Sequence, residues 1–442
     1  MARADRPALM SEVGGAGAEA AGQAVAAVWR IESARIVGAL ARYTGDFALA
    51  EDVAQEALAE ALVAWSQSGL PDSPVNWLLA TARRRAVDAF RRRSALDARY
   101  SMLASPLAEG EFSSGVQVAP GSGAEFLPWD PDRVDDDVLA LMFIACHPVL
   151  SPEARVALTL RVVAGLSSEE IARAFLVSTP TIQARITRAK KTIAAARVPF
   201  ELPPAEDRRE RLGAVLSVLY VIFTEGSTAT VGDRLLRPDI AYEAVRLART
   251  LAALLSDEPE VYGLLALFEL TSARFPARTG ADGEPVLLED QDRRLWDRSA
   301  IRRGLALLGR ATATGRGLGP FGLQAAIAAC HATAPSAKDT DWERVVLLYE
   351  ALGRVAPSPV VELNRAVAVA MASGPQDALF MVDDLVASGR LAGSYLLPSV
   401  RGELLSRLGR KSEARAELEL ATRLCQNVRE RSVLIRKTAA LS

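Results

Sequence analysis

The 442-residue sequence is poor in the residues that carry most enzyme chemistry. It has three cysteines, far apart, and only two histidines. Few, widely spaced cysteines argue against a disulfide framework and suit a reducing cytoplasm. Two histidines leave little for general acid–base work, and no Ser/His/Asp or Cys/His arrangement indicates covalent catalysis. We therefore expect no enzyme activity, no catalytic residue, and no cofactor or metal site.

Long apolar runs are missing as well. No stretch of about 18 apolar residues is free of charge, which excludes a membrane-spanning helix. Residues 1–28 lack a basic start followed by an apolar run, so no export signal is visible. We expect a soluble, cytoplasmic chain with no membrane partner. Aromatic residues make up only 6% of the sequence, whereas Ala, Leu, Arg and Glu are abundant, which favours helix throughout.

The small net charge of -2 hides a segregated chain. Residues 155–197 hold eight lysines and arginines against two glutamates, whereas residues 104–138 hold one arginine against eight acids. The near-neutral total therefore conceals strongly basic and strongly acidic segments.

Composition and helical periodicity divide the chain into segments of all-α character. The length suits about three domains. We expect a disordered leader (1–24), a helical domain (25–102), an acidic linker (103–137), a second helical domain (138–197), a Pro-rich linker (198–207) and a long helical domain (208–442).

The last segment contains two similar stretches, "AVAVAMASGPQDALF" and "RGELLSRLGRKSEAR". Their turn glycines, Gly374 and Gly409, lie 35 residues apart. A helix, a glycine turn and a second helix at about this period are typical of tetratricopeptide (TPR) repeats, so we predict a TPR-like array. The alternative is an irregular helical bundle.

"GLSSEEIARAFLVSTPTIQARITRAKKTI" (165–193) predicts two short helices joined by a tight turn. Ser167 and Glu170 have the spacing of a capping box. Thr179 followed by Pro180 indicates the start of the second helix, with the threonine hydroxyl as its cap. The inward face of the first helix would be Ile171, Ala172 and Phe175.

The second helix of this pair has a basic outer face without any acid. Apolar residues at helical spacing face inward, namely Ile182, Ile186, Ala189 and Ile193. An acid-free basic face after a two-helix turn is what a reader of the DNA major groove needs, because its first residues meet bases and its later cations neutralise phosphates. Arg185 could contact guanine, and Gln183 could pair with adenine or serve as a positioning contact. The alternative is a basic face that merely meets solvent. The candidate DNA contacts are Thr181, Gln183, Ala184, Arg185, Arg188 and Lys191.

An upstream stretch, "AEDVAQEALAEALVAW" (50–65), predicts a helix with an acid and amide patch. Asp52, Gln55 and Glu56 project outward and suit a protein partner. The inward residues are predicted to be Val53, Ala57, Ala61, Leu62 and Trp65.

The next stretch, "PVNWLLATARRRAVDAFRRRS" (74–94), predicts a helix with a basic flank. Its inward candidates are Trp77, Leu78, Ala82 and Val87. The flank consists of Arg83, Arg84, Arg85, Arg91, Arg92 and Arg93.

In these motifs and their order, residues 25–197 resemble a group IV (extracytoplasmic-function) sigma factor of bacterial RNA polymerase. Residues 50–65 resemble region 2.2, residues 74–94 regions 2.3 and 2.4, and residues 150–193 region 4. "DGEPVLLEDQDRRLWD", "QAAIAACHATAPSAKDTDW" and "PSPVVELNRAVAVA" in the C-terminal half resemble the subgroup with a fused C-terminal TPR-like domain.

The resemblance implies a role for each surface. Asp52, Gln55 and Glu56 would dock on core RNA polymerase, which contacts sigma factors through its two largest subunits. Arginines 83, 84, 85, 91 and 92 would grip the opening -10 element, and residues of the 179–195 helix would read the -35 element as duplex. Melting takes bases out of the stack and must be offset by new contacts. The acidic linker would lie in basic channels of the polymerase or only aid solubility.

The resemblance also implies an association with small DGPF/YCII-like proteins and a regulatory role for residues 208–442. Two departures limit it. "FTEGS" (223–227) replaces an expected Asn and aromatic residue around "EG", and the order Gln183–Ala184 differs from the usual recognition helix, so promoter preference does not carry over. The alternative function is a TPR-containing helix-turn-helix regulator that acts without polymerase. An enzymatic C-terminal half ranks third.

Three further motifs each allow a purely structural interpretation and a ligand-binding one. "GRGLGPFG" (315–322) has no strand before it, so a helix-connecting loop is favoured over a phosphate cradle. The two "ACH" motifs, at His147 and His331, favour core cysteines over zinc ligands. In residues 282–297, Glu289, Asp290 and Asp292 could bind a metal or ligand, but pairing with Arg293, Arg294 or Arg298 is favoured.

Overall fold

The computed structural model describes residues 8–104, 131–228, 235–280 and 283–441. Across these ranges the chain forms eighteen α-helices and three short 3-10 helices, and no strand beyond an isolated bridge between Thr279 and Pro285. The all-α prediction is therefore confirmed for the described residues. Residues 1–171 and 178–215 form one compact unit, and residues 172–177 and 216–442 form the other.

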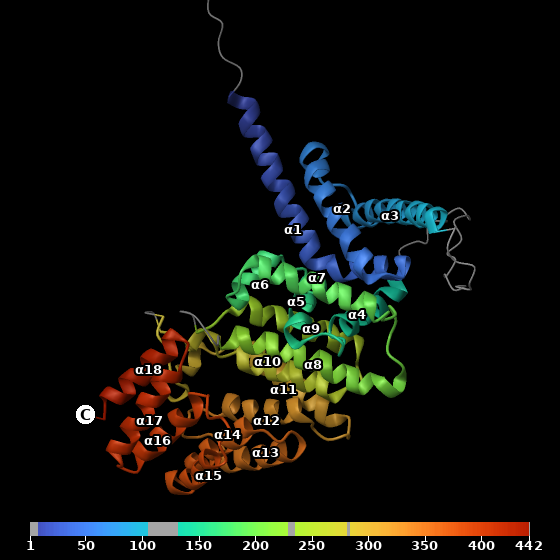
Figure 1. Ribbon diagram of the computed structural model, residues 1–442. Helices are drawn as coiled ribbons and strands as arrows, with labels where there is room; N and C mark the ends of the chain where they lie inside the picture. The colour runs from blue at the N-terminus through green and yellow to red at the C-terminus, as the bar shows by residue number, and fades with distance from the viewer. Residues whose placement is uncertain (1–7, 105–130, 229–234, 281–282, 442) are drawn as a thin grey trace, which may run out of the picture. The chain divides into compact units, whose positions relative to one another are not determined.

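The first unit begins with three helices, α1 (Ala8–Thr44), α2 (Phe47–Ser68) and α3 (Pro74–Ala104) (Figure 1). The helices are separated at "TGD" (44–46) and "SGLPDSP" (68–74). Asp46 caps α2 by accepting a hydrogen bond from the Leu49 backbone N–H at 3.1 Å. Gly69 ends α2 at a positive φ of 80°, a conformation that glycine adopts without strain.

The expected disordered leader, residues 1–24, is wrong for most of its length. Residues 1–7 lie outside the described residues, but α1 is already helical from Ala8. The reason is that this stretch is rich in alanine, the strongest helix former, and continues into a helix that is anchored by buried residues from Ala21 and Val25 onward.

The expected acidic linker is also shorter than residues 103–137. Helix α3 runs to Ala104 and α4 starts at Pro131, a residue that suits the first turn of a helix. Residues 105–130, which carry much of the predicted linker, lie outside the described residues.

Four further helices complete the N-terminal half: α4 (Pro131–Ala145), α5 (Pro152–Val162), α6 (Ser168–Phe175) and α7 (Thr179–Ala195). The predicted capping box of α6 is confirmed. The Ser167 N–H donates to the Glu170 carboxylate at 2.8 Å, and the Glu170 N–H donates to the Ser167 hydroxyl at 3.1 Å. The cap of α7 is Ser178 and not Thr179, because the extended backbone of Ser178 lets its hydroxyl reach the Thr181 N–H.

Helix α8 (Ala205–Ser227) follows the Pro-rich linker and leads into the second unit. Helix α10 (Pro259–Ser272) is buried on nearly every side, and Phe268 of this helix stacks on Phe223 of α8 with ring centroids 4.1 Å apart. Around it lie α9 (Pro238–Leu254), α11 (Arg298–Ala313) and α12 (Pro320–Thr333). The segment between α10 and α11 holds the 3-10 helices η1 (Phe275–Ala277), η2 (Leu288–Asp290) and η3 (Arg293–Leu295).

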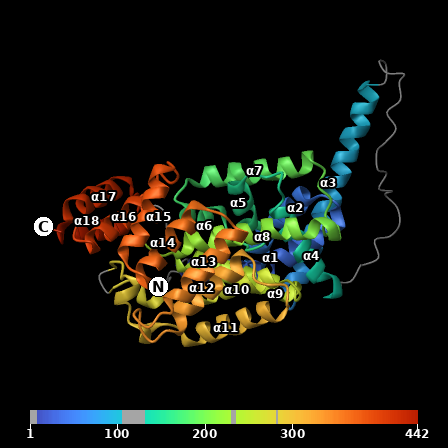
Figure 2. The ribbon, with the colours of Figure 1, turned by 90° about the horizontal axis from the view of Figure 1, so that it is seen from below.

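The rest of the second unit consists of consecutive antiparallel helices, whose last members α16, α17 and α18 lie together at one end in both views (Figure 1, Figure 2). Their bounds are α13 (Trp342–Val355), α14 (Pro359–Ala372), α15 (Pro375–Ala387), α16 (Leu396–Arg407), α17 (Lys411–Leu424) and α18 (Val428–Ala439).

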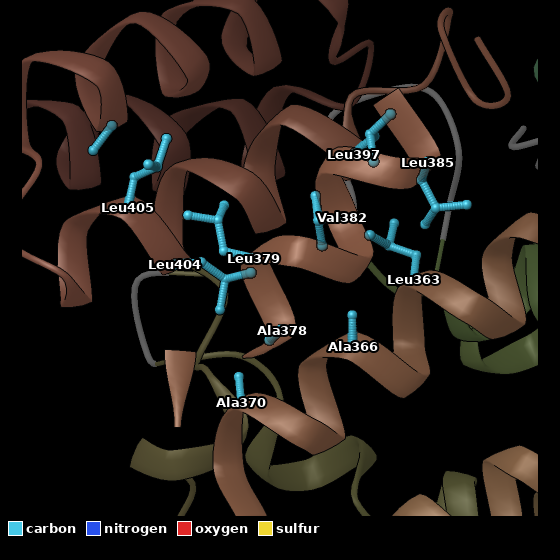
Figure 3. Packing of buried hydrophobic residues seen from close by; sticks show 11 residues of the cluster. Leu363, Ala366, Ala370, Ala378, Leu379, Val382, Leu385, Leu397, Leu404 and Leu405 are labelled. Atoms are coloured by element: carbon cyan, nitrogen blue, oxygen red, sulfur yellow. The ribbon is translucent and has the colours of Figure 1, made fainter. Parts of the chain in front are cut away.

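The two predicted repeats are helix–glycine–helix pairs. Gly374 joins α14 to α15 and Gly409 joins α16 to α17, both at positive φ, as a tight turn between helices requires. Leucines, valine and alanines of the two pairs share one core cluster (Figure 3). This shared core is what repeat stacking needs, because a single helix pair cannot bury its apolar face alone.

None of the described helices is both long enough and apolar enough to cross a bilayer.

Candidate nucleic-acid and protein interfaces

Helix α2 presents the predicted acid and amide patch on its outer side. Asp52 is 61% exposed, Glu56 is exposed and Gln55 is half-buried. The Gln55 amide nitrogen is buried and has no hydrogen-bond partner among the described residues. A buried donor without a partner costs about 1–3 kcal/mol, so an acceptor supplied by a binding partner would stabilise this position.

The opposite side of α2 is the core side. Val53, Ala57, Ala61 and Trp65 are buried, as predicted. Leu62 was predicted to face inward and is instead 45% exposed. It follows Ala61 directly, and one helical residue rotates the side chain by about 100°, which turns Leu62 out of the buried stripe.

Helix α3 carries the arginine flank, and α2 partly neutralises it. Arg85 donates to Glu60 at 2.8 Å and lies 4.0 Å from Glu56. Arg83 is half-buried, with its guanidinium 5.6 Å from the centre of the Tyr43 ring. The remaining arginines of the flank are exposed, namely Arg84, Arg91, Arg92 and Arg93. The acid patch and the basic flank are thus neighbouring and partly paired surfaces.

The core of α3 follows the prediction in part. Leu78 and Ala82 are buried, whereas Trp77 and Val87 are only half-buried. Trp77 packs edge-on against Trp65 of α2, with ring centroids 5.6 Å apart, so it ties the two helices together at the edge of the core.

Helix α7 has the predicted two-sided pattern. Its four inward residues are buried. Gln183, Ala184, Arg188 and Lys191 are exposed, while Thr181 and Arg185 are half-buried. The Thr181 hydroxyl lies 2.8 Å from the Ser178 hydroxyl and so takes part in the helix cap. The outer face of α7 itself carries no acid.

An acid from α5 nevertheless lies beside this face. Ser151, Glu153, Arg185 and Arg188 are among the residues that line a cavity of about 430 Å³ between the start of α5 and α7. Hydrogen bonds from its own backbone N–H and from Ser151 lower the pKa of Glu153, and the charge of Arg185 adds to this effect. A DNA phosphate or base that approaches Arg185 would therefore also meet the negative charge of Glu153. The spacing of residues along the sequence could not show this, because α5 and α7 are separate elements.

Comparison with known protein families decides the identity. Residues 30–95 match the family described as Sigma-70 region 2, and residues 140–193 match Sigma-70, region 4. A "Probable ECF RNA polymerase sigma factor SigI" of Mycobacterium tuberculosis is 29% identical over 185 residues, which cover 42% of this chain and 59% of that protein. The chain belongs to the ECF-like sigma factors and carries a C-terminal extension.

The extension has relatives too. Residues 211–312 match a family of unknown function, DUF6596. The "Uncharacterized protein R00370" of Rhizobium meliloti (strain 1021) is 45% identical over 394 residues, which cover 89% of this sigma factor and 90% of that protein. No solved structure matches the chain significantly.

In the extension of this sigma factor, the glycine loop 315–322 surrounds an anion that the chain itself supplies. The Glu260 carboxylate accepts hydrogen bonds from the N–H groups of Gly319, Phe321 and Gly322 at 3.0, 2.8 and 3.0 Å. A Cβ on Gly319 would come within 2.6 Å of the Glu260 carboxyl carbon, so a side chain there would displace the carboxylate. The carboxylate occupies the helix N-terminus that a phosphate would need, which supports the helix-connecting loop.

The described part of the polar segment, residues 283–297, is held by ion pairs within the segment and with α18. Asp292 binds Arg294 at 2.8 Å and accepts its backbone N–H at 2.9 Å, as predicted, and these bonds lower the pKa of Asp292 to about 2. Glu284, which sequence reasoning did not single out, binds Arg429 and Arg436 of α18 at 2.6 and 2.7 Å and accepts from the Ser432 hydroxyl. Among the described residues no group of three metal-ligating side chains occurs.

The two histidines lie in different surroundings. His147 Nδ1 accepts from the Val149 N–H at 3.1 Å. His331 packs edge-on against Trp342, and burial together with Arg274 and Arg293 lowers its pKa to about 4. The adjacent cysteines, Cys146 and Cys330, are buried and free. Both ACH motifs therefore have the surroundings of packed core residues.

Proposed function

We propose that this sigma factor binds core RNA polymerase through Asp52, Gln55 and Glu56, reads a -35 element with α7 and grips the -10 element with the arginines of α3. The observation that carries the proposal is the combination of surfaces in one chain: an acid and amide patch, a neighbouring arginine flank and a separate acid-free recognition face. A DNA-binding regulator without polymerase would need only the last of these.

The α2 patch supports the polymerase contact in two ways. Asp52 and Glu56 are exposed carboxylates, and the Gln55 amide lacks a hydrogen-bond partner among the described residues. Exposed Leu62 and Val63 lie about two turns further along the same helix. Apolar side chains beside a polar patch are the usual composition of a protein interface, whose centre excludes water.

The α3 flank supports a single-strand contact at the -10 element. Arg91 and Arg92 are exposed, and among the described residues their one partner is the local Asp88, through its carboxylate for Arg91 and its carbonyl oxygen for Arg92. Loosely held guanidinium groups can follow a flexible backbone and stack on bases that have left the duplex.

Helix α7 supports a duplex contact at the -35 element. Gln183 and Arg185 lie in its N-terminal half, where a helix in the major groove meets base edges, and Arg188 and Lys191 follow on the same outer side.

The C-terminal extension is proposed to modulate polymerase and promoter binding. Its stacked helix pairs would offer a surface that binds either a partner or the sigma regions. A partnership with small DGPF/YCII-like proteins stays a prediction. We propose no catalytic role for any residue, and a place of action in the cytoplasm, where the polymerase works.

Binding to core polymerase tests the proposal. The triple variant Asp52→Ala/Gln55→Ala/Glu56→Ala should lose at least about tenfold in affinity, since truncated interface residues at a desolvated centre commonly cost more than 1 kcal/mol each. Asp72→Asn, an exposed change beyond the end of α2, is the control. Unchanged polymerase binding of the triple variant would contradict the proposed interface, and DNA binding without any polymerase binding would favour the alternative of an independent regulator.

A further inference from the structure

Helix α7 carries one cation, Lys190, that faces α2 and not the outer recognition surface. Its Nζ lies 2.7 Å from Glu51 Oε2 and 2.6 Å from Asp52 Oδ1, and its side chain is only 15% exposed. Burial by itself lowers the pKa of Lys190, but Glu51 and Asp52 more than compensate, so the pKa is raised. Asp52 belongs to the patch that the proposed function assigns to polymerase.

We propose that Lys190 is the centre of a latch that holds region 4 on the polymerase-binding face of α2, and that core polymerase must displace Lys190 from Asp52 in order to bind. The proposal rests on the proposed function of the α2 patch. The latch consists of Lys190 and Arg161 of region 4 with Glu51 and Asp52 of region 2.

Glu51 makes the latch specific. Its side chain is 4% exposed, and it also lies 3.4 Å from Arg161 Nε of α5, so two helices of region 4 each contribute a cation to one carboxylate of α2. Removing one partner of a buried ion pair is strongly destabilising, because the remaining charge lacks compensation. The closed arrangement therefore depends on Lys190 far more than an exposed surface pair would.

Close packing elsewhere supports the same arrangement. A Cβ added to Gly38 of α1 would lie 3.0 Å from the Asp137 Cβ of α4 and 3.2 Å from its backbone. A Cβ added to Gly165, before α6, would lie 2.7 Å from the Ser33 hydroxyl and 3.0 Å from the Trp29 carbonyl oxygen of α1. At Gly165, which has a positive φ of 72°, region 4 thus packs on α1 without room for a side chain, and at Gly38 α4 packs on α1 nearly as closely.

Opening the latch changes both binding surfaces at once. Asp52 loses its internal cation and becomes available to a polymerase residue. Lys190 loses its two acids and adds a positive charge to α7, which bears the proposed -35 face. Polymerase and promoter DNA then each favour the open form, and by linkage each strengthens the binding of the other.

The first experiment measures the latch in the full-length protein without polymerase. Spin labels at Ser68→Cys on α2 and Ala194→Cys on α7 report the distance between the helices, since both positions are exposed and the native cysteines are buried. We expect a narrow distribution in the parent and a longer, broader one with Lys190→Gln. Arg197→Gln is the matched control, because Arg197 is exposed and forms no ion pair among the described residues. If Lys190→Gln leaves the distribution of spin-label distances unchanged, the proposal that Lys190 holds α7 on α2 is overturned.

The second experiment measures affinity for core polymerase. Lys190→Gln should bind about five- to fiftyfold more tightly than the parent, because a larger fraction of molecules is open. Gly38→Leu, which leaves all four latch residues in place, should act in the same direction by wedging α1 from α4. Glu51→Gln should also open the latch, and the double variant with Lys190→Gln should add little.

The outcomes separate the two proposals. If the parent and all variants fail to bind polymerase while the spin-label distances change as expected, the latch stands as a conformational device and the proposed function fails. If the parent binds polymerase but Lys190→Gln and Gly38→Leu bind no more tightly than Arg197→Gln, the proposed function stands. The proposal that Lys190 competes with polymerase for Asp52 is then overturned.

Discussion

The Glu260 carboxylate accepts hydrogen bonds from the backbone N–H of Gly322 and of Gly319, both at 3.0 Å, at the first turn of α12. Glu260 lies in the first turn of α10, so one side chain satisfies the free amides of another helix and fixes two central helices of the extension to each other.

Substitution of Glu260 should therefore destabilise the extension without touching the sigma regions. We expect Glu260→Gln to lower the free energy of unfolding of the extension by about 1–3 kcal/mol. The three hydrogen bonds lose their charge assistance, and at least one backbone N–H of the α12 turn would face the NH2 group of the glutamine, which cannot accept a hydrogen bond. Denaturant-dependent hydrogen exchange of α12 measures this. Glu258→Gln, which affects only an ion pair with Arg316 at 3.7 Å, should stay within about 0.5 kcal/mol of the parent. Equal effects of the two changes would contradict this role of Glu260.

Glu284 should hold the C-terminal helix α18 to the loop that precedes α11. Bonds from Ser432, Arg436 and Arg429 lower the pKa of Glu284 to about 2. Because the folded pKa lies below the ordinary value of about 4.5, the stabilising effect is present above pH 4.5 and is lost as the pH falls toward 2. Glu284→Gln should raise hydrogen exchange in α18 at neutral pH, whereas Asp292→Asn, which removes a pair confined to its own loop, should not. If α18 were equally protected from hydrogen exchange in both variants, Glu284 would not hold α18 to this loop.

His331 should make the extension sensitive to mild acid. Its folded pKa of about 4 lies below the unfolded value of about 6.5, so the unfolded chain takes up the proton first as the pH falls. Stability is complete above pH 6.5 and should fall by about 1.4 kcal/mol per pH unit toward pH 4. Denaturant-dependent hydrogen exchange of α12 at pH 7 and pH 5 measures the slope, which His331→Gln should largely remove. A variant that keeps the parent's slope would show that another group is responsible.

The two cations at the ends of the α7 face should differ in their effect on DNA binding. Arg185→Ala should reduce discrimination between promoter sequences by about 1–3 kcal/mol at one base pair. Lys191→Ala should weaken binding to all sequences and lower the salt dependence by about one released ion. Competition binding at two salt concentrations distinguishes them. If Arg185→Ala instead behaves like Lys191→Ala, Arg185 contacts phosphate and does not read a base.

Much of the fold follows from patterns within single helices. The inward residues Ile182 and Ile186, the capping box of Ser167 and the turns at Gly374 and Gly409 all depend on neighbours a few positions away, where periodicity and capping rules apply. The surface patch around Asp52 could be placed for the same reason.

The misses arise where distant elements meet or where a pattern is marginal. Lys190 received no role because its two acids lie about 140 residues earlier in the chain, and periodicity within α7 cannot show them. Glu284 and Glu260 likewise act on segments far along the chain. Leu62 was placed inward because an apolar residue beside the buried stripe looks like its continuation, and the helix rotates it outward.

Transcription from fragmented genomic DNA with purified core polymerase tests the central claim most directly. Sequencing of the RNA 5′ ends should show discrete start sites that appear only when the full-length chain is added, share upstream -35 and -10 elements, and disappear with Asp52→Ala/Gln55→Ala/Glu56→Ala. The same start sites with and without the chain, or none at any ratio of chain to polymerase, would contradict a role in promoter recognition.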